Sequence, residues 1–479
     1  MEISLQFSVH KLFKFMLSKT FKHTIESQDI RNLMMSNKNI LKIILTKSVS
    51  VNKYSISSLK DWKQEDLQKI HKLYYDYDDT ILLTNQLLPF SNLKKLTFHY
   101  SFNQPIICDM LPKNLIKITM SSYFNRTITK YTFSELKKLK YLIFGTCFNS
   151  PITKDAFKEN NESLTHLTLG QQFNRPIIRE ALPETLTHLI FGENFNQPII
   201  RGSLPKSLLC LTFGNNFNQP ILRGQLTNEF VESSGTNKIN LTNLTFGTNF
   251  NKPLKENVLP NTLTNLTFGT NFNQPLKENV LPNALTHLTL GYKFNQNNLS
   301  ELPINLIYLC FGACFNQPIE LSRLKNLIHL IFGRDFNQKL KKDSLPNSLK
   351  YLIFGYKFNK LIENDIIPDT LIHLNLGNSY NEPIMENTLP DSLNDLIFGD
   401  SFNKIITKGT LPRSLTKLVF GCGYEQSIEK GVLPESLIFL TFSWRVNPLK
   451  FLQTAKDILP EKLTHLIFHE CYKNQIELF

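Results

Sequence analysis

The sequence predicts a solenoid of stacked coils, each about 22 residues long and each adding one short strand to a parallel sheet. From Leu88 to the end of the chain one phrase returns, Leu-Pro and then Leu-x-x-Leu-x-Phe-Gly-x-x-Phe-Asn-Gln-Pro-Ile. All 23 prolines occupy two slots of this phrase, and 13 of the 19 glycines directly follow its strand-like segment. A fixed period of this length indicates a protein built from stacked structural repeats.

The strand of each coil is predicted by the segment Leu-x-x-Leu-x-Phe. A clean copy runs from Leu182-Pro183 through Leu189 and Phe191 to Pro198. Its apolar residues alternate with period two, which is typical of a strand with one buried face. Proline and glycine bound the segment, because proline removes a backbone donor and glycine permits dihedral angles that mark bends. We therefore expect a turn, a strand, a second turn and an extended return in every coil.

The core is predicted to form between coils rather than within them. One coil cannot bury its own leucines and phenylalanines, so stacking on its neighbours must complete the core. The recurrence gives about 17 coils between residue 88 and residue 479. At about 4.8 Å between adjacent strands, the sheet would extend roughly 80 Å along its ladder.

An asparagine follows the second aromatic residue of the phrase in 14 consecutive coils, from Asn103 to Asn403. Bends in a solenoid leave backbone groups that no strand satisfies, and a buried side-chain amide offers both a donor and an acceptor. We interpret these residues as a structural asparagine ladder rather than as a binding site.

The phrase Phe-Asn-Gln-Pro-Ile, together with Leu-Thr-His-Leu-x-Phe-Gly, resembles the FNIP repeat, a relative of the leucine-rich repeats common in amoebae and their giant viruses. The resemblance covers residues 88–479 and implies a leucine-rich-repeat-like solenoid used for protein–protein interaction. The copies depart from the pattern at Asn297-Asn298, at Lys339-Leu340 and in the last three coils. Extra polar residues near 228–238 predict a loop that bulges from one turn.

Residues 1–45 lack the repeat and have the apolar spacing of a small α-helical segment. The stretch from Asp29 to Ile40 is similar to the second half of an F-box, which implies docking on a Skp-type adaptor of a cullin–RING ubiquitin ligase. The candidate docking residues are Ile30, Leu33 and Lys38. This chain lacks the opening Leu-Pro and the closing Trp of an F-box, so the alternative is a helical cap on the first coil. Residues 46–87 are expected to form a connecting segment and an irregular first coil.

The sequence shows no pattern that predicts catalysis, a cofactor or a metal. Six of the eleven histidines share the slot before the second Leu, which elsewhere holds Asn243, Asp395 or Lys417, as a variable exposed position does. The pair Cys310 and Cys314 lacks a second pair of ligands for zinc. Phosphate-binding loops and nucleophile elbows are absent from the sequence. We predict a protein that is not an enzyme and carries no cofactor.

A partner surface is predicted on the residues that flank the buried Leu of each strand, because side chains of a strand alternate between its two faces. In leucine-rich-repeat-like proteins, which the chain resembles, this face is concave and binds partners. Exposed isoleucine beside tyrosine and histidine is typical of an interaction surface, although β-propensity alone would also favour these residue types. The candidate residues are Ile190, Tyr308, Ile331, Tyr351, Ile353, Ile397 and Val419.

The composition of the chain limits the classes of partner it could bind and the cellular compartments in which we expect it. The net charge of +13 is spread along the chain, which does not favour nucleic acid. The seven cysteines are scattered, and the chain has no stretch typical of a secretory leader or a membrane helix. We expect an intracellular, cytoplasmic protein (in the host cytoplasm if viral) that is not secreted and does not associate with membranes. Three function classes stay open: a substrate receptor or adaptor, a plain scaffold or host-protein binder, and a salt-sensitive nucleic-acid binder.

Overall fold

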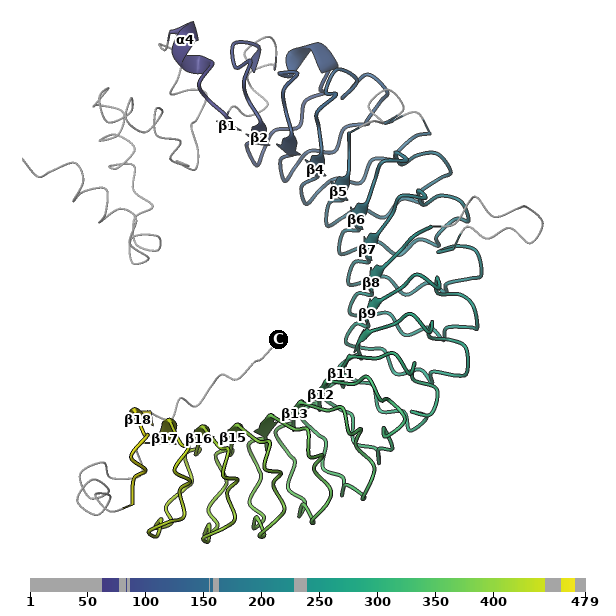
Figure 1. The fold of residues 1–479 in the computed structure, drawn as a ribbon. Helices are drawn as coiled ribbons and strands as arrows, with labels where there is room; N and C mark the ends of the chain where they lie inside the picture. The colour runs from purple at the N-terminus through teal and green to yellow at the C-terminus, as the bar shows by residue number, and fades with distance from the viewer. Residues whose placement is uncertain are drawn as a thin grey trace, which may run out of the picture.

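A computed structural model describes residues 63–76, 83, 87–154, 156–157, 163–227, 239–443 and 458–469. These residues form one 18-stranded parallel sheet that curves into a wide arc, with the strands along its inner rim (Figure 1). The predicted repeat solenoid with leucine-rich-repeat-like coils is confirmed. The predictions for the helical segment 1–45 and for the loop near 228–238 lie outside the described residues.

Each coil contributes one strand, and most strands are three residues long. The strands are β1 (Lys72–Tyr75), β2 (Lys95–Phe98), β3 (Lys117–Thr119), β4 (Tyr141–Ile143), β5 (His166–Thr168), β6 (His188–Ile190), β7 (Cys210–Thr212), β8 (Asn243–Thr245), β9 (Asn265–Thr267), β10 (His287–Thr289), β11 (Tyr308–Cys310), β12 (His329–Ile331), β13 (Tyr351–Ile353), β14 (His373–Asn375), β15 (Asp395–Ile397), β16 (Lys417–Val419), β17 (Phe439–Ser443) and β18 (His465–His469). A short helix α4 (Gln64–Leu67) precedes β1, and a 3-10 turn η4 (Cys108–Met110) follows β2. No helix in the described ranges is long and apolar enough to cross a membrane.

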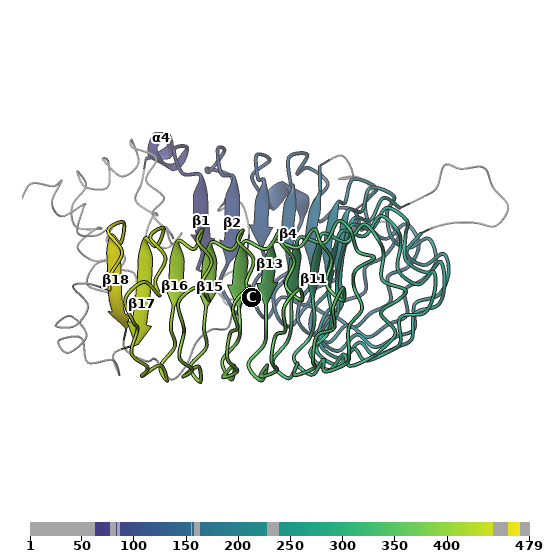
Figure 2. The ribbon, with the colours of Figure 1, turned by 60° about the horizontal axis from the view of Figure 1, so that its bottom comes forward.

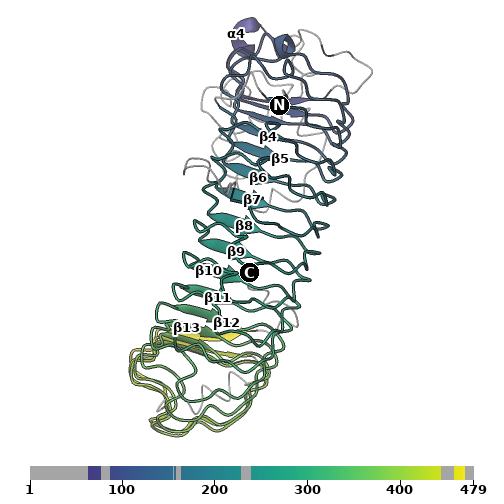
Figure 3. The ribbon, with the colours of Figure 1, turned by 90° about the vertical axis from the view of Figure 1, so that its right-hand side faces the viewer.

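Successive coils keep the same register. The middle leucines of neighbouring strands pair directly, as Leu244 of β8 pairs with Leu266 of β9. The pairing also bridges the extra residues near 228–238, because Leu211 of β7 pairs with Leu244. All strands run in the same direction across the arc (Figure 2), and β4 to β13 follow one another in chain order (Figure 3). Each slot of the phrase therefore becomes a column along the solenoid.

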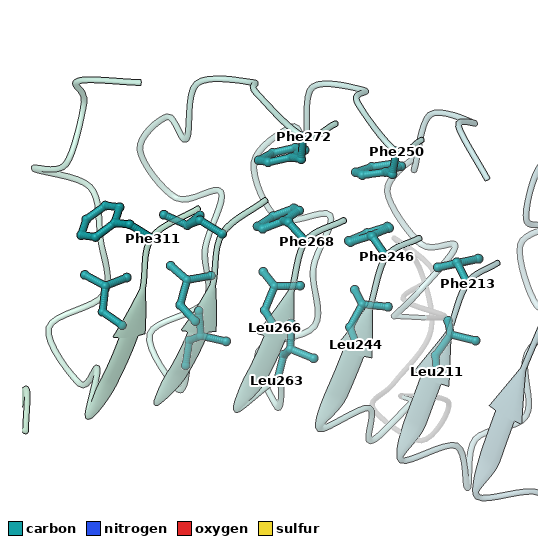
Figure 4. Packing of buried hydrophobic residues seen from close by; sticks show 14 of the residues in the cluster. Leu211, Phe213, Leu244, Phe246, Phe250, Leu263, Leu266, Phe268, Phe272 and Phe311 are labelled. Carbon is teal, nitrogen blue, oxygen red and sulfur yellow. The ribbon is translucent and has the colours of Figure 1, made fainter. Parts of the chain in front are cut away.

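Three of these columns form the core. In the coil of β8 they are Leu244 in the strand, Phe246 at its end and Phe250 in the following turn, and all three are buried (Figure 4). The two rings of the coil stack with centroids 3.9 Å apart. Phe246 also stacks on Phe268 at 5.6 Å, and Phe250 stacks on Phe272 at 6.0 Å. The core is therefore a continuous pillar of leucine and phenylalanine that no single coil could build alone.

The glycine column at the end of the strands has a steric cause. A Cβ added to Gly247 would lie 1.9 Å from the carbonyl oxygen of Gly214 in the preceding coil. Gly247 does not adopt a left-handed conformation. The interpretation of this column as a dihedral requirement is therefore wrong at Gly247. The residue must be glycine because the backbones of two successive coils touch there.

A different slot, in the return turn, does require a left-handed backbone. In nearly all coils this slot holds glycine, asparagine or aspartate, since these residues tolerate positive φ best. Gly202 has φ +78°, and Asn257 occupies the same slot in a later coil with φ +56°. In this slot the described residues with positive φ are Glu180, Gly202, Gly224, Asn257, Asn279, Asp343, Asp365, Asn387, Gly409 and Gly431. Gly377, which belongs to the column at the end of the strands, also has positive φ.

The cysteines do not all share one state. Cys147, Cys210, Cys310 and Cys314 carry free thiols. Cys422 is disulfide-bonded, which the scattered spacing of the cysteines did not suggest.

Candidate functional site

The inner face of the arc carries two columns of side chains that point away from the core. Strand β13 illustrates the pattern, because Leu352 is buried while Tyr351 is 38% exposed and Ile353 is half-buried. The first residues of the strands make one column and the third residues make the other. Both columns follow the concave rim along which the strands lie in Figure 1.

The structure places each predicted partner residue at the first or third position of a strand. These residues are Ile190 in β6, Tyr308 in β11, Ile331 in β12, Tyr351 and Ile353 in β13, Ile397 in β15 and Val419 in β16. Ile190 is 43% exposed, and all except Ile190 and Tyr351 are half-buried. Their role in binding stays a prediction.

The register brings four of these residues together. Ile331 pairs with Ile353, and Tyr308 lies two strands from Tyr351 in the neighbouring column. Ile397 and Val419 pair with each other, but Asn375 separates them from Ile353. Ile190 stands apart, five strands before Tyr308 in the sheet. We call Tyr308, His329, Ile331, Tyr351 and Ile353 the inner patch.

A stack of aromatic and imidazole rings runs through this patch. Its members fill the first position of five successive strands: His287, Tyr308, His329, Tyr351 and His373. His329 and Tyr351 stack with centroids 4.4 Å apart and an angle of 11° between planes. A second stack joins His166 to His188 at 4.1 Å. We expected this slot only to be variable and exposed, although rings in five successive coils were a visible signal of stacking.

Burial shifts the pKa of two groups of the inner patch, His329 and Tyr308, toward their uncharged forms. Burial, followed by the nearby His287, lowers the pKa of His329 from its ordinary value. Burial, followed by Cys310, raises the pKa of Tyr308 to about 12. Burial also raises the pKa of the Cys310 thiol. These shifts favour the uncharged forms of His329 and Tyr308, which share the inner patch with the aliphatic side chains of Ile331 and Ile353.

The residue types on the inner face change from charged to polar to apolar and back to charged along the arc. Three lysines, Lys72, Lys95 and Lys117, align in register on β1, β2 and β3. Asparagine and threonine fill both columns of β8 and β9. The inner patch follows, and beyond it His373 and Asp395 approach to 3.4 Å. The inner patch is thus bounded by a polar zone on one side and by charged residues on the other.

The described part of the chain contains no group of three His, Cys, Asp or Glu residues placed to hold a metal ion.

The asparagine column forms a ladder at the rim where the strands end. In each step the backbone N–H of one asparagine donates to Oδ1 of the asparagine in the preceding coil, as Asn218 donates to Asn196 at 2.9 Å. The same bond repeats from Asn125 to Glu425, at 2.8–3.0 Å. The structural ladder is therefore present, but its amides are half-buried or exposed rather than buried, and the ladder itself uses only their oxygens.

Replacing Asn218 by alanine should lower the free energy of unfolding by about 0.5–1.5 kcal/mol, because the N–H of Asn251 loses its acceptor at 3.0 Å in a half-buried position. Asn218→Asp keeps a side-chain oxygen in that place and should retain most of the stability. Urea denaturation of both variants measures the difference. Equal destabilisation by alanine and aspartate would show that this bond contributes nothing.

A curved parallel sheet, one short strand per coil and a core of leucine and phenylalanine columns define a solenoid of the leucine-rich-repeat type. The chain belongs to the FNIP repeat family. The family model described as "FNIP Repeat" matches residues 83–123, 162–194, 195–226, 239–271, 272–299, 325–357, 358–401 and 402–445.

The chain is also similar to solved structures. CroV588, described as a novel circular LRR protein, is 37% identical to this chain, and the match covers 86% of this chain and 68% of CroV588 with a TM-score of 0.67. A leucine-rich-repeat protein of Leptospira interrogans is 17% identical, covering 86% of this chain and 99% of that one, with a TM-score of 0.48. YopM of Yersinia enterocolitica is 17% identical over 78% of each chain, with a TM-score of 0.37. No curated protein matches the chain.

Proposed function

We propose that this chain is a non-enzymatic protein-binding module, used as a substrate receptor or adaptor, whose partner docks on the inner patch. A repeat fold of the leucine-rich-repeat type is consistent with a protein–protein interaction module. The observation that supports the patch is the ring stack beside Ile331 and Ile353 on a concave sheet face. Aromatic residues are enriched and charged residues depleted at the centres of protein interfaces, which fits this composition.

The test replaces Ile331, Ile353 and Ile397 together by serine in the full chain. None of the three side chains is buried in the core, so the fold should remain while affinity-purified partner falls at least tenfold. The matched control replaces Thr245, Thr267 and Thr289 by serine, in the same column but outside the patch. Unfolding of the isoleucine variant, or equal partner capture by both variants, would contradict the proposal.

The more specific proposal, recruitment of a ubiquitin ligase through an F-box-like segment, rests on the sequence match between Asp29 and Ile40. Those residues, including Ile30, Leu33 and Lys38, lie outside the described residues. Deleting residues 1–45 should remove a Skp-type adaptor from pull-downs while the solenoid keeps its own partner. Full-length protein that never retains such an adaptor would leave a plain scaffold or host-protein binder as the function.

A further inference from the structure

The rim where the strands end carries a second row of asparagines beside the ladder. In four coils the buried phenylalanine lies between two asparagines, as Phe217 lies between Asn216 and Asn218. We call the residues before the ring the leading row (Asn194, Asn216, Asn249 and Asn271) and those after it the trailing row (Asn196, Asn218, Asn251 and Asn273). Members of both rows, together with Lys293, line a groove of about 630 Å³.

The trailing row contributes amide donors that the fold does not use. The Oδ1 atoms of Asn218 and Asn251 accept the backbone N–H of the next coil. Their Nδ2 groups donate to none of the described residues. Each trailing amide therefore keeps two N–H donors for an outside group.

The leading row contributes amides that are only half used. Nδ2 of Asn249 donates to Oδ1 of Asn216 at 2.9 Å, and Nδ2 of Asn271 donates to Oδ1 of Asn249 at 2.9 Å. One N–H and one lone pair of Asn249 are left, because a primary amide has two of each. The two rows together offer donors and acceptors in each of these coils, and the backbone of a polypeptide needs both.

The spacing of the coils at this rim matches an extended polypeptide. The ring centroids of Phe195, Phe217 and Phe250 follow one another at 6.0 Å, and the asparagines flank these rings directly. Two residues of a polyproline II or extended chain advance about 6.2–6.8 Å. A peptide along the groove would therefore meet one pair of asparagines per dipeptide.

One end of the groove is positively charged. Lys293 takes the leading slot in the coil after Asn271, and its side chain is exposed. Among the described residues no carboxylate lies within ion-pair distance of its ammonium. An ammonium at the end of a neutral polar groove is suited to a carboxylate, either a chain terminus or an acidic side chain.

We propose that this groove is a second binding site, separate from the inner patch, for an extended polypeptide segment with a carboxylate beside Lys293. The proposal does not depend on the concave face, because the groove lies on the turns that follow the strands of β6 to β10. The groove would recognise the backbone and a carboxylate of the peptide. The inner patch would instead contact its partner through rings and aliphatic side chains.

The test uses the full chain and a pool of random decapeptides with free carboxyl termini, with retained peptides identified by mass spectrometry. The groove variant is Asn218→Asp with Asn251→Asp, which keeps the ladder oxygens and removes the free donors. The control is Asn359→Asp with Asn381→Asp, which changes the same ladder slot away from the groove. The dissociation constants of retained peptides should rise at least tenfold for the groove variant and less than twofold for the control.

The charged end is tested with the same peptides carrying an amidated carboxyl terminus. Amidation should weaken binding to the wild-type chain about fivefold and leave binding to Lys293→Gln unchanged. Failure to retain any peptide, or equal losses in the groove and control variants, would overturn the proposal. Neutral linear oligosaccharides that bind the wild-type chain and not the groove variant would also overturn it, by assigning the groove to glycans.

Discussion

Replacing Gly247 by alanine is expected to lower the free energy of unfolding by about 3 kcal/mol or more, at or above the upper end for overpacked sites. The added methyl would lie 1.9 Å from the carbonyl oxygen of Gly214, and the obstacle is backbone, which cannot rotate away. The two coils must therefore move apart. This weakens the stacking of Phe213 on Phe246, whose ring centroids are 5.6 Å apart in the wild-type chain.

The unfolding profile should also change shape. Stability in a solenoid is the sum of coil terms and nearest-neighbour contacts, so a defect in the middle of the array uncouples the coils on its two sides. Guanidinium denaturation followed by circular dichroism should show two transitions instead of one. The control is Gly202→Asn, because Asn257 already occupies that turn slot with positive φ. A single transition with unchanged midpoint for Gly247→Ala would show that the coils are not in close backbone contact.

Replacing Phe217 by alanine should cost about 3–5 kcal/mol, the usual range for removing a large buried ring. Phe217 is fully buried and stacks on Phe195 and Phe250 at 6.0 Å on either side. It also stacks on Phe213 of its own coil at 3.9 Å. The alanine substitution therefore leaves a cavity in which three neighbouring rings lose their contacts at once.

The matched control for Phe217 is Leu222→Ala, five residues later in the same coil. Leu222 is 51% exposed, so its truncation should change the free energy of unfolding by less than about 0.5 kcal/mol. The stability of both variants is measured from the midpoint of denaturant unfolding. Equal effects of the two substitutions would contradict a core built on the phenylalanine columns.

The sequence pattern was sufficient to predict the solenoid, its strands and its asparagine ladder, because each of these depends on one residue type that recurs at one position of the repeat. Leu244, Phe246 and Phe250 are buried as their period predicts. The role of Gly247 was misread, because a glycine needed for close approach and a glycine needed for positive φ look identical in a sequence.

The curvature of the arc could not be predicted, because it depends on distances between coils. Neighbouring strands lie about 4.8 Å apart in any sheet. Behind them Phe246 and Phe268 are 5.6 Å apart, and farther along the coil Phe250 and Phe272 are 6.0 Å apart. The stacked rings therefore spread the coils more than the strands do, and the sheet bends toward its strand side.

The inner patch was predicted in part. Ile331, Tyr351 and Ile353 were placed on the open face by alternation alone. The stacking of His329 on Tyr351 depends on ring orientation, which alternation does not determine. The asparagine groove was missed because the sequence alone does not show that Asn216 and Asn218, on either side of the buried Phe217, line one groove.

Binding on the inner patch is tested most directly by a photo-crosslinking amino acid placed at Tyr351 or at Tyr356 of the full chain. Both positions hold tyrosine, with 38% and 55% of the side chain exposed, but Tyr351 lies in β13 on the inner face and Tyr356 in the turn beyond it. After irradiation in cells, we expect a discrete protein adduct at Tyr351 that is lost when Ile331, Ile353 and Ile397 are replaced by serine. An adduct from Tyr356 alone, or one from Tyr351 that survives the serine substitutions, would contradict it.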